Sequence, residues 1–407
     1  MGNTPNIRFK GFTDDWEQRK LGEIVERVTR KNQDLVSELP LTISAQYGLI
    51  DQNEFFDKRV ASKDVSGYYL IYNGEFAYNK STSSDAPWGA IKRLDRYENG
   101  VLSTLYIVFR IKNEDILNSD FLMNYYDTNN WHKDIQAIAS EGARNHGLLN
   151  IAPADFFETE LMLPQDIEEQ KNIGNYFKSL NNLITLHQRK CDETKKLKKF
   201  MLQKMFPKKD AKKPEIRFAG FTNDWEQRKL MEVAEYRNGK AHENEINDDG
   251  EYIVVNSKFV STNGEIRKFS YAQNEPLYEN EIAFVLSDVP NGRAIARTFL
   301  VDKSGKYTLN QRIAGITPHE DTDPYYLYIK MNRNEYFLKF DDGNKQTNLS
   351  IKDVLNYEDM YPSYKEQQKI GMYFQQLDHL ITLHQRKCDE LKEFKKYMLQ
   401  NMFPQKG

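Results

Sequence analysis

Apolar residues recur three and four positions apart in two long stretches of the chain. This spacing predicts two long helices, each with a narrow apolar seam. The stretches cover residues 169–207 and 367–404, and both contain the segment LITLHQRKCDE, beginning at Leu183 and again at Leu380. A narrow seam requires a partner helix, so we expect the two copies to pack together. The seam positions are Ile173, Phe177, Leu180, Ile184, His187, Cys191, Thr194, Met201 and Met205, and Ile370, Phe374, Leu377, Ile381, His384, Cys388, Leu391, Met398 and Met402.

A second repeat precedes each helix by more than a hundred residues. Residues 5–21 read PNIRFKGFTDDWEQRKL, and residues 214–230 read PEIRFAGFTNDWEQRKL. Trp16 and Trp225 in these start segments are expected to anchor a packing contact. The order of start segment, variable body and helix therefore occurs twice, which predicts a pseudo-two-fold axis within one chain.

The two variable bodies contain short β-type runs separated by turn signals, with some helix, so we expect α+β bodies. Segment 73–78 aligns with 279–284, and 142–144 with 343–345. Strands are predicted at residues 41–44, 68–72, 75–78, 105–111, 252–255, 282–286, 294–297 and 312–316, with helix at 119–138 and from Pro324. The expected division is a first domain at 1–163, a helix at 164–206, a linker at 207–214, a second domain at 215–361 and a helix at 362–407.

Composition narrows the class of protein. Apolar residues make up 39% and charged residues 29% of the chain, which suits a soluble globular protein. We find no run of about 18 apolar residues that would suggest a membrane span and no apolar leader. With only two cysteines, a reducing cytoplasm is the expected compartment. A net charge of −3 argues against general coating of nucleic acid, but it leaves room for local basic faces.

Signatures of enzymes are missing from the sequence. There is no phosphate-binding loop, no glycine-rich dinucleotide loop and no nucleophile elbow, so we expect no catalytic or cofactor-binding residue and no metal in this chain. One alternative stays open: His187 with Cys191, and His384 with Cys388, each share a helical face and would make a Cys2His2 metal site if they met. The other reading is that all four are seam residues, with cysteine acting as a small hydrophobe.

A basic segment follows the first seam. Residues 187–213 contain 11 Lys or Arg against 3 Asp or Glu. Such a helix end would suit contact with DNA phosphates. We favour the other reading, a solvated helix face whose cations are favoured near the helix C-terminus, because these lysines are spread around the helix.

Several polar loops in both bodies carry residues suited to reading DNA bases. Arginine pairs bidentately with guanine, and Asn or Gln with adenine. Each loop taken alone is also compatible with an ordinary polar turn. The candidate DNA contacts are Tyr78, Asn79, Lys80, Ser81, Ser83, Trp88, Arg144, Asn145 and His146 in the first body, and Arg293, Gln311, Arg312, Lys345, Gln346 and Thr347 in the second.

Taken together, these motifs resemble one family. Each helix opens on a Glu-Gln-x-Lys-Ile-Gly pattern, with Glu169, Gln170 and Gly174 in the first copy and Gln367 and Gly371 in the second, and each closes on Met-Phe-Pro. The first copy departs slightly, with Lys171-Asn172 where the second has Gln368-Lys369. With the repeated DWEQRKL start, the whole chain resembles the specificity (S) subunit of Type I restriction-modification systems.

The resemblance implies two target recognition domains that each read one half of a split, asymmetric DNA sequence. It implies that the long helices pack antiparallel, set the spacing and dock partners. The chain would have no catalysis of its own and would assemble with two modification subunits that methylate adenine N6, and with restriction subunits. S-adenosylmethionine, ATP and Mg²⁺ would belong to those partners. The rival interpretations are a coiled-coil scaffold that binds no DNA and a fused enzyme, which would need a cofactor motif.

Overall fold

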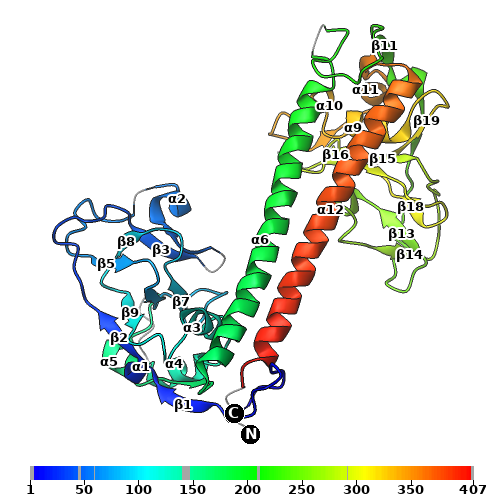
Figure 1. The fold of residues 1–407 in the computed structure, drawn as a ribbon. Coiled ribbons are helices and arrows are strands. Elements are labelled where there is room, and N and C mark those ends of the chain that lie inside the picture. The colour runs from blue at the N-terminus through cyan, green and yellow to red at the C-terminus, as the bar shows by residue number, and fades with distance from the viewer. Residues whose placement is uncertain are drawn as a thin grey trace. The chain divides into compact units, whose positions relative to one another are not determined.

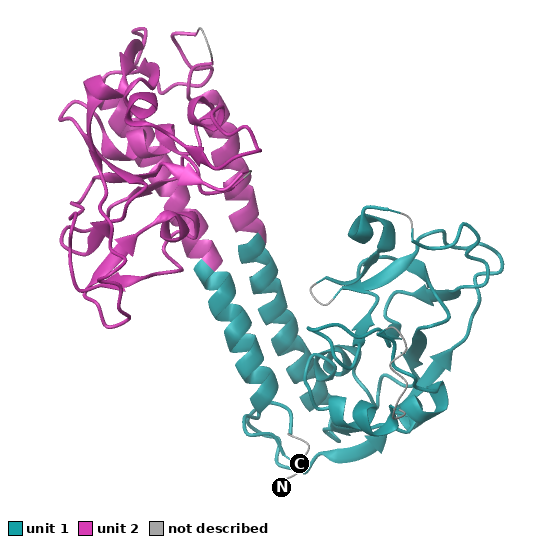
Figure 2. Cartoon of the chain, turned by 180° about the vertical axis from the view of Figure 1, so that it is seen from behind, with its two compact units in different colours: residues 1–188, 386–407 teal, residues 189–385 magenta. Residues whose placement is uncertain are grey.

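A computed structural model describes residues 4–44, 47–58, 60–139, 147–208, 211–290 and 292–404. The chain forms two compact units, coloured separately in Figure 2: residues 1–188 with 386–407 (unit 1), and residues 189–385 (unit 2). Two long helices, α6 (Ile167–Lys204) and α12 (Tyr364–Asn401), each contribute one half to each unit (Figure 1). Each unit thus contains one body of mixed helices and strands and two helix halves, which confirms the expected α+β tandem fold.

The body of unit 1 is built on a four-stranded antiparallel sheet. Its strand order is β2 (Val25–Val28), β9 (Ile107–Ile111), β6 (Phe76–Asn79) and β7 (Ala90–Arg93). The start segment forms β1 (Glu17–Lys20), which pairs with β10 (Glu160–Leu163) immediately before α6. The remaining elements are β3 (Leu41–Ser44) with β4 (Gly48–Asp51), β5 (Tyr69–Tyr72) with β8 (Asn99–Leu102), and the helices α1 (Leu21–Ile24), α2 (Gln52–Phe56), α3 (Ser119–Tyr125), α4 (His132–Ile138) and α5 (Pro153–Phe157).

The body of unit 2 repeats this plan. Its main sheet runs β12 (Ala234–Asn238), β19 (Ile313–Pro318), β15 (Ile282–Val285) and β17 (Thr298–Leu300), and β11 (Glu226–Lys229) pairs with β21 (Glu358–Tyr361). Because β6 and β15 hold the same place in their sheets, the alignment of 73–78 with 279–284 is confirmed. The other elements are β14 (Phe269–Ser270), β13 (Tyr252–Val255) and β18 (Tyr307–Leu309) in one sheet, β16 (Ser287–Asp288) with β20 (Thr347–Asn348), and α7 (Leu230–Val233), α8 (Ser257–Ser261), α9 (Pro324–Met331), α10 (Glu335–Leu338) and α11 (Ile351–Leu355).

One predicted strand is wrong. Residues 294–297 form a turn, and the strand β17 begins only at Thr298. The backbone N–H groups of Ala294 and Ile295 donate to the carboxylate of Asp288, at 2.6 and 3.1 Å, instead of joining a ladder. Ala296 adopts a left-handed conformation with φ of 57°. A side-chain acceptor has therefore displaced the strand that the apolar residues favour.

The seam prediction is confirmed in both helices. Phe177 and Cys191 in α6, and Phe374 and Cys388 in α12, are fully buried. In unit 1, Phe177 lies against Phe403 with ring centroids 6.1 Å apart, and in unit 2, Phe206 lies against Phe374 at 6.1 Å. The start of each helix thus meets the end of the other, so the helix halves run antiparallel within each unit.

The two cysteines have the surroundings of seam residues. Cys191 Sγ lies 3.7 Å from the Ile381 carbonyl oxygen, and Cys388 Sγ lies 3.9 Å from that of Ile184. Across the ranges that the structure describes, no three His, Cys, Asp or Glu side chains are grouped so that they could hold a metal ion. The contacts favour the packing interpretation of this pattern.

A buried ion pair explains the start segment and the helix opening together. Arg8 pairs with Glu169 at 2.6 Å in unit 1, and Arg217 pairs with Glu366 at 2.7 Å in unit 2. Each carboxylate side chain is only 1% exposed. Because a buried charge requires a partner, the Ile-Arg-Phe motif and the Glu of the Glu-Gln pair that opens each helix are needed together.

The glutamine and glycine of the helix opening pack against the body. Gln170 accepts from the N–H of Asn118 at 2.9 Å, as Gln367 accepts from that of Asp323 at 3.1 Å. A Cβ on Gly371 would lie 2.4 Å from Asp323 Oδ1. Glycine is therefore needed where the helix meets the N-terminus of α9. As predicted, Trp16 and Trp225 are buried beside the closing Phe of each unit.

The basic segment at the end of α6 is partly neutralised by acidic neighbours. Lys198 pairs with Asp378 at 2.5 Å, while Lys204 and Lys208 both pair with Glu215. These contacts favour the interpretation of a solvated helix end. No helix within the described ranges combines the length and the apolar character that crossing a membrane requires.

Candidate nucleic-acid interface

In unit 2 most of the predicted DNA contacts lie around the short strand β16. The N–H of Leu286, just before it, donates to the carbonyl of Arg312 at 3.0 Å. Gln346 Nε2 donates to the hydroxyl of Ser287 at 2.8 Å. Asp288 binds the backbone next to Arg293 through its carboxylate. Three loops that are far apart in sequence thus converge on one edge of the body.

Three cations of this group have free side chains. Arg293, Arg312 and Lys345 are exposed, and none of them forms a side-chain hydrogen bond or ion pair with the residues described here. With Gln346 they form what we call the unit 2 cluster. Long, unpaired donors are suited to phosphate oxygens and to the acceptor edge of guanine.

Two other predicted contacts in unit 2 are engaged or buried. The amide of Gln311 donates to the carboxylate of Glu243, so its donor is already used. Thr347 is 5% exposed, and its hydroxyl has no hydrogen-bond partner among the described residues. The prediction that Thr347 contacts DNA at the surface is wrong for this conformation, because β20 turns the side chain inward.

In unit 1 the predicted loop lies in the equivalent place. Ser81 bridges to Leu148, and the N–H of Thr82 donates to the carbonyl of Gly147 at 2.7 Å. This pairing corresponds to β16 with β20 in unit 2. The predicted contacts Arg144, Asn145 and His146 lie outside the described residues, as does segment 142–144.

The remaining polar residues of the unit 1 loop mostly cap turns. Asn79 Oδ1 accepts from the N–H of Ser81 at 3.0 Å, and Ser83 Oγ accepts from that of Ala86 at 3.1 Å. Lys80 is half-buried and donates to the carbonyl of Ile151 at 3.3 Å. Burial, with a smaller effect from the charge of Arg27, lowers the pKa of its ammonium. Both open interpretations, turn and contact, remain compatible with this geometry.

Tyr78 is a core residue, so its prediction as a DNA contact is wrong. It is 0% exposed, stacks on Phe156 with centroids 5.1 Å apart, and donates its hydroxyl to the carbonyl of Trp88 at 2.8 Å. Burial raises the pKa of its phenol. Trp88 is half-buried and packs against the same core, so only part of its ring faces solvent.

Asp288 is the residue of this region that the sequence did not single out. Its carboxylate accepts from the N–H groups of Val289, Ala294 and Ile295. A Cβ on Gly292 would lie 2.0 Å from Asp288 Oδ2, so glycine is needed there. The only local signal was the Asp-Val-Pro-Asn-Gly sequence, which is typical of a turn.

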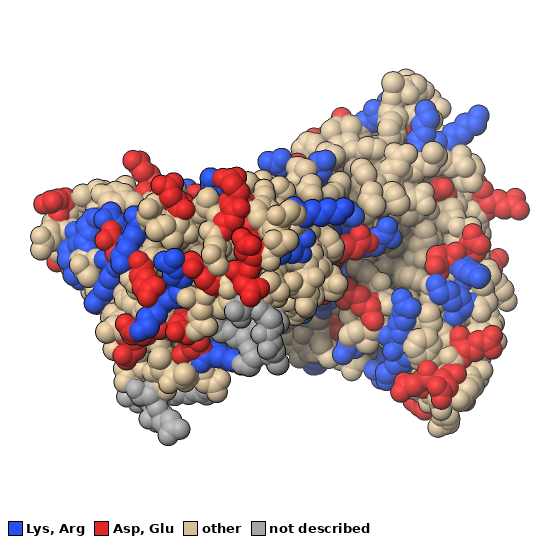
Figure 3. All heavy atoms as spheres, turned by 60° about the horizontal axis from the view of Figure 1, so that its bottom comes forward, with Lys and Arg blue, Asp and Glu red and all other residues tan. Residues whose placement is uncertain are grey.

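Charge is mixed on the face that Figure 3 shows. Lys and Arg side chains alternate there with Asp and Glu and do not form one continuous basic field. This fits the net charge of −3. This face therefore offers no continuous basic surface to a DNA duplex.

The fold and the cluster define a class of protein: a tandem pair of recognition bodies carried by two long helices. The family model described as the Type I restriction modification DNA specificity domain matches residues 13–196 and 222–393. The chain therefore belongs to this family, as a specificity subunit of a Type I restriction-modification system.

Individual relatives agree with this assignment. The chain is 24% identical to the Type I restriction enzyme MjaVIII specificity subunit of Methanocaldococcus jannaschii, over 95% of this chain and 91% of that protein. It is 21% identical to the putative MjaX specificity subunit of the same organism, over 95% and 92%. The crystal structure of the S subunit from M. genitalium matches 99% of this chain and all of that one, with a TM-score of 0.65 at 15% identity.

Proposed function

We propose that each unit reads one half of a bipartite DNA target and that, because the bodies differ, the target is asymmetric. The observation that carries this proposal is one body topology present twice with different polar loops. The strand order β2-β9-β6-β7 recurs as β12-β19-β15-β17, whereas the loops beside β6 and β15 share little sequence. A common scaffold with divergent loops suits one task performed on two sequences.

The proposal includes partner subunits that perform the chemistry. Two modification subunits would bind S-adenosylmethionine and methylate adenine N6, and restriction subunits would use ATP and Mg²⁺. This chain would have no catalytic role. An adenine inside a duplex must be flipped into a partner's pocket, and residues here would hold the surrounding duplex.

An exposed apolar stripe on the long helices supports docking of the modification subunits. Leu197 and Phe200 on α6, and their repeat equivalents Phe394 and Tyr397 on α12, are about half exposed. Within each pair the two residues lie three apart and are neighbours on the helix surface, beside the seam, since Leu197 follows Thr194 by three residues and Phe394 follows Leu391 by three. Exposed aromatic residues of this kind are typical of interfaces.

The primary test is a genome-wide map of methylated adenine in cells with and without this gene, the modification subunit being present. We expect a split, asymmetric motif that disappears on deletion. If the map is unchanged, binding of DNA by the purified complex decides between a DNA reader and the scaffold alternative. The scaffold alternative predicts no salt-dependent retardation, whereas a DNA reader that neutralises phosphates must show it.

The helix pair is proposed to set the spacer between the half-sites. Each helix has 38 residues. Inserting four residues in each helix, between Gln188 and Arg189 and between Gln385 and Arg386, adds about 6 Å. We expect the unspecified spacer of the methylated motif to lengthen by about two base pairs, with both half-sites retained. An unchanged spacer in an assembled, active complex contradicts the proposal that the helix pair sets the spacer length.

Substitutions in the unit 2 cluster should separate two kinds of contact. Arg312→Ala is expected to cost about 1–3 kcal/mol at one base pair and to relax specificity there. Lys345→Ala should weaken binding to all sequences and reduce the slope of log K against log salt by about 0.9. Binding isotherms with substituted duplexes measure both. Lys303→Ala, at an exposed lysine outside the cluster, is the matched control and should change neither.

A further inference from the structure

The turn that carries Arg312 has a conformation that needs external support. The N–H of Ile313 donates to the carbonyl of Asn310 at 3.3 Å, closing a four-residue turn. Arg312 occupies its third position with φ of 66°, a left-handed conformation that is disfavoured for a long side chain. Such residues persist only when their surroundings hold them.

The support comes from the segment that follows β12. The N–H of Gln311 donates to the carbonyl of Lys240 at 2.9 Å, and the N–H of Lys240 donates to that of Leu309 at 3.0 Å. A Cβ on Gly239 would lie 2.0 Å from the carbonyl oxygen of Asn310. The close approach therefore depends on a glycine. The carbonyl of Lys240 holds the turn from this side, while the N–H of Leu286 holds it from the other by donating to the Arg312 carbonyl at 3.0 Å.

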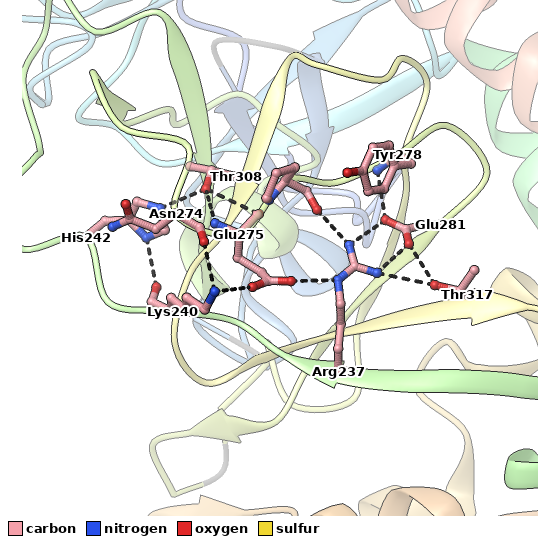
Figure 4. A network of polar contacts seen from close by, with 10 residues as sticks. Arg237, Lys240, His242, Asn274, Glu275, Tyr278, Glu281, Thr308 and Thr317 are labelled. Carbon is pink, nitrogen blue, oxygen red and sulfur yellow. Dashed lines mark hydrogen bonds and ion pairs between the residues drawn. The ribbon is translucent and has the colours of Figure 1, made fainter.

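His242 fixes the carbonyl of Lys240. The residue is 1% exposed, with Nδ1 2.8 Å from the Lys240 oxygen and Nε2 2.8 Å from the hydroxyl of Thr308 on β18. A carbonyl oxygen only accepts, so Nδ1 must carry the proton and donate. Figure 4 shows the ring lying between these two groups.

The same network continues away from the turn. Lys240 Nζ pairs with Glu275 at 3.0 Å, and Glu275 also binds Arg237 at 2.9 Å (Figure 4). Arg237 is paired with Glu281, which overcomes the effect of burial and raises the pKa of the guanidinium. The segment from Arg237 to His242 is thereby held both by its hydrogen bonds to the turn and by its ion pairs with Glu275 and Glu281.

Only part of this network is common to both units. Arg30 pairs with Glu75 at 3.0 Å in unit 1, as Arg237 pairs with Glu281 in unit 2. The N–H of Tyr72 donates to Glu75 as that of Tyr278 donates to Glu281. The sequence has no histidine before residue 132, so the His242 branch is specific to the second body.

We propose that His242 is a positioning residue for DNA reading by unit 2. It acts through the Lys240 carbonyl and the Gln311 N–H to hold Arg312 in its reading orientation. The inference rests on the proposed function. Without the ring, the Lys240 carbonyl keeps the Gln311 N–H but loses its second donor. The turn is then less constrained and Arg312 loses its preferred direction, whereas unit 1 is unaffected.

The test uses the assembled complex of this chain with its modification subunits. Dissociation constants are measured for the target duplex and for duplexes with single base-pair changes in each half-site. For His242→Leu we expect discrimination to fall about tenfold at one or two base pairs of the unit 2 half-site. Discrimination at the unit 1 half-site should be unchanged. His242→Asn keeps a donor near the Nδ1 position and should retain most of the discrimination, whereas His242→Gln should not.

A double-mutant cycle separates positioning from general folding. In an Arg312→Ala background, His242→Leu should have no further effect on discrimination, because both act through the same side chain. Additive losses, or equal losses in both half-sites, would overturn the proposal. If His242→Leu does not fold, the comparison of His242→Asn with His242→Gln decides instead. A wild-type complex that discriminates at no base pair refutes the proposed function itself.

Discussion

Replacing Arg217 with methionine is expected to destabilise unit 2 by about 3–5 kcal/mol, because it leaves a buried carboxylate without a partner. Glu366 is 1% exposed and accepts both hydrogen bonds of the Arg217 guanidinium, at 2.7 and 2.8 Å. Methionine preserves most of the volume, so the loss reports the uncompensated charge. Urea unfolding measures the loss in free energy of unfolding, and hydrogen exchange of the amides in β11 and β21 locates that loss in unit 2.

The control for this result is a second substitution at the same site. In Arg217→Met with Glu366→Gln the charge is absent, and we expect much of the stability to return. Lys20→Met, which breaks the exposed ion pair with Glu158, should leave the free energy of unfolding nearly unchanged, because solvent screens exposed ion pairs. A double variant as unstable as the single one would show that packing, and not charge, is what Arg217 supplies.

The helices and start segments were predictable because their signals are local or repeated in the chain with few changes. A seam such as Ile173, Phe177 and Leu180 shows its period within a few turns. The partner of Arg8 was not predictable in this way, since Glu169 lies 161 residues away. The His242 branch has the same character, because nothing near residue 242 indicates that Thr308 will lie beside it.

The errors at the candidate site have one physical origin. Tyr78 and Thr347 stand at the ends of polar loops, and composition alone suggests that such residues are exposed. Tyr78 lies in β6, where Phe76, Ala77 and Tyr78 are all buried because the sheet is covered on both faces. Thr347 is the inward-facing residue of β20, whose other residue, Asn348, is exposed. The strand prediction at residues 294–297 failed because the Asp288 carboxylate, six residues before Ala294, binds the backbone of Ala294 and Ile295, and a pattern of apolar residues does not show that contact.

Some parts of the chain are repeated in both units, and other parts differ between them. The start segments, the helix openings and the seam are repeated, and each makes the same buried contact in both units. The residues exposed beside β6 and β15 differ between the units, and so does the network that supports them. Sequence change at these exposed loops is therefore possible without disturbing the buried ion pairs that join each body to its helices.

The exposed stripe on the helices gives the second large expected effect. Phe394 and Tyr397 are 45% and 54% exposed, and no described element of the body covers them fully. Truncating a central aromatic contact typically costs about 2 kcal/mol. Phe394→Ala with Tyr397→Ala should therefore weaken binding of one modification subunit roughly a thousandfold. Alanine maintains the helix, so its stability should not change.

The repeat supplies an internal comparison for this prediction. Leu197→Ala with Phe200→Ala removes the equivalent pair on α6 and should affect the other modification subunit. Native mass spectrometry then distinguishes complexes with one modification subunit from those with two, and the quadruple variant should bind neither. Tyr271→Ala, at an exposed tyrosine of the unit 2 body, is the control and should assemble normally. Full occupancy in the quadruple variant would place the docking surface elsewhere, because a stripe that can be removed without loss is not an interface.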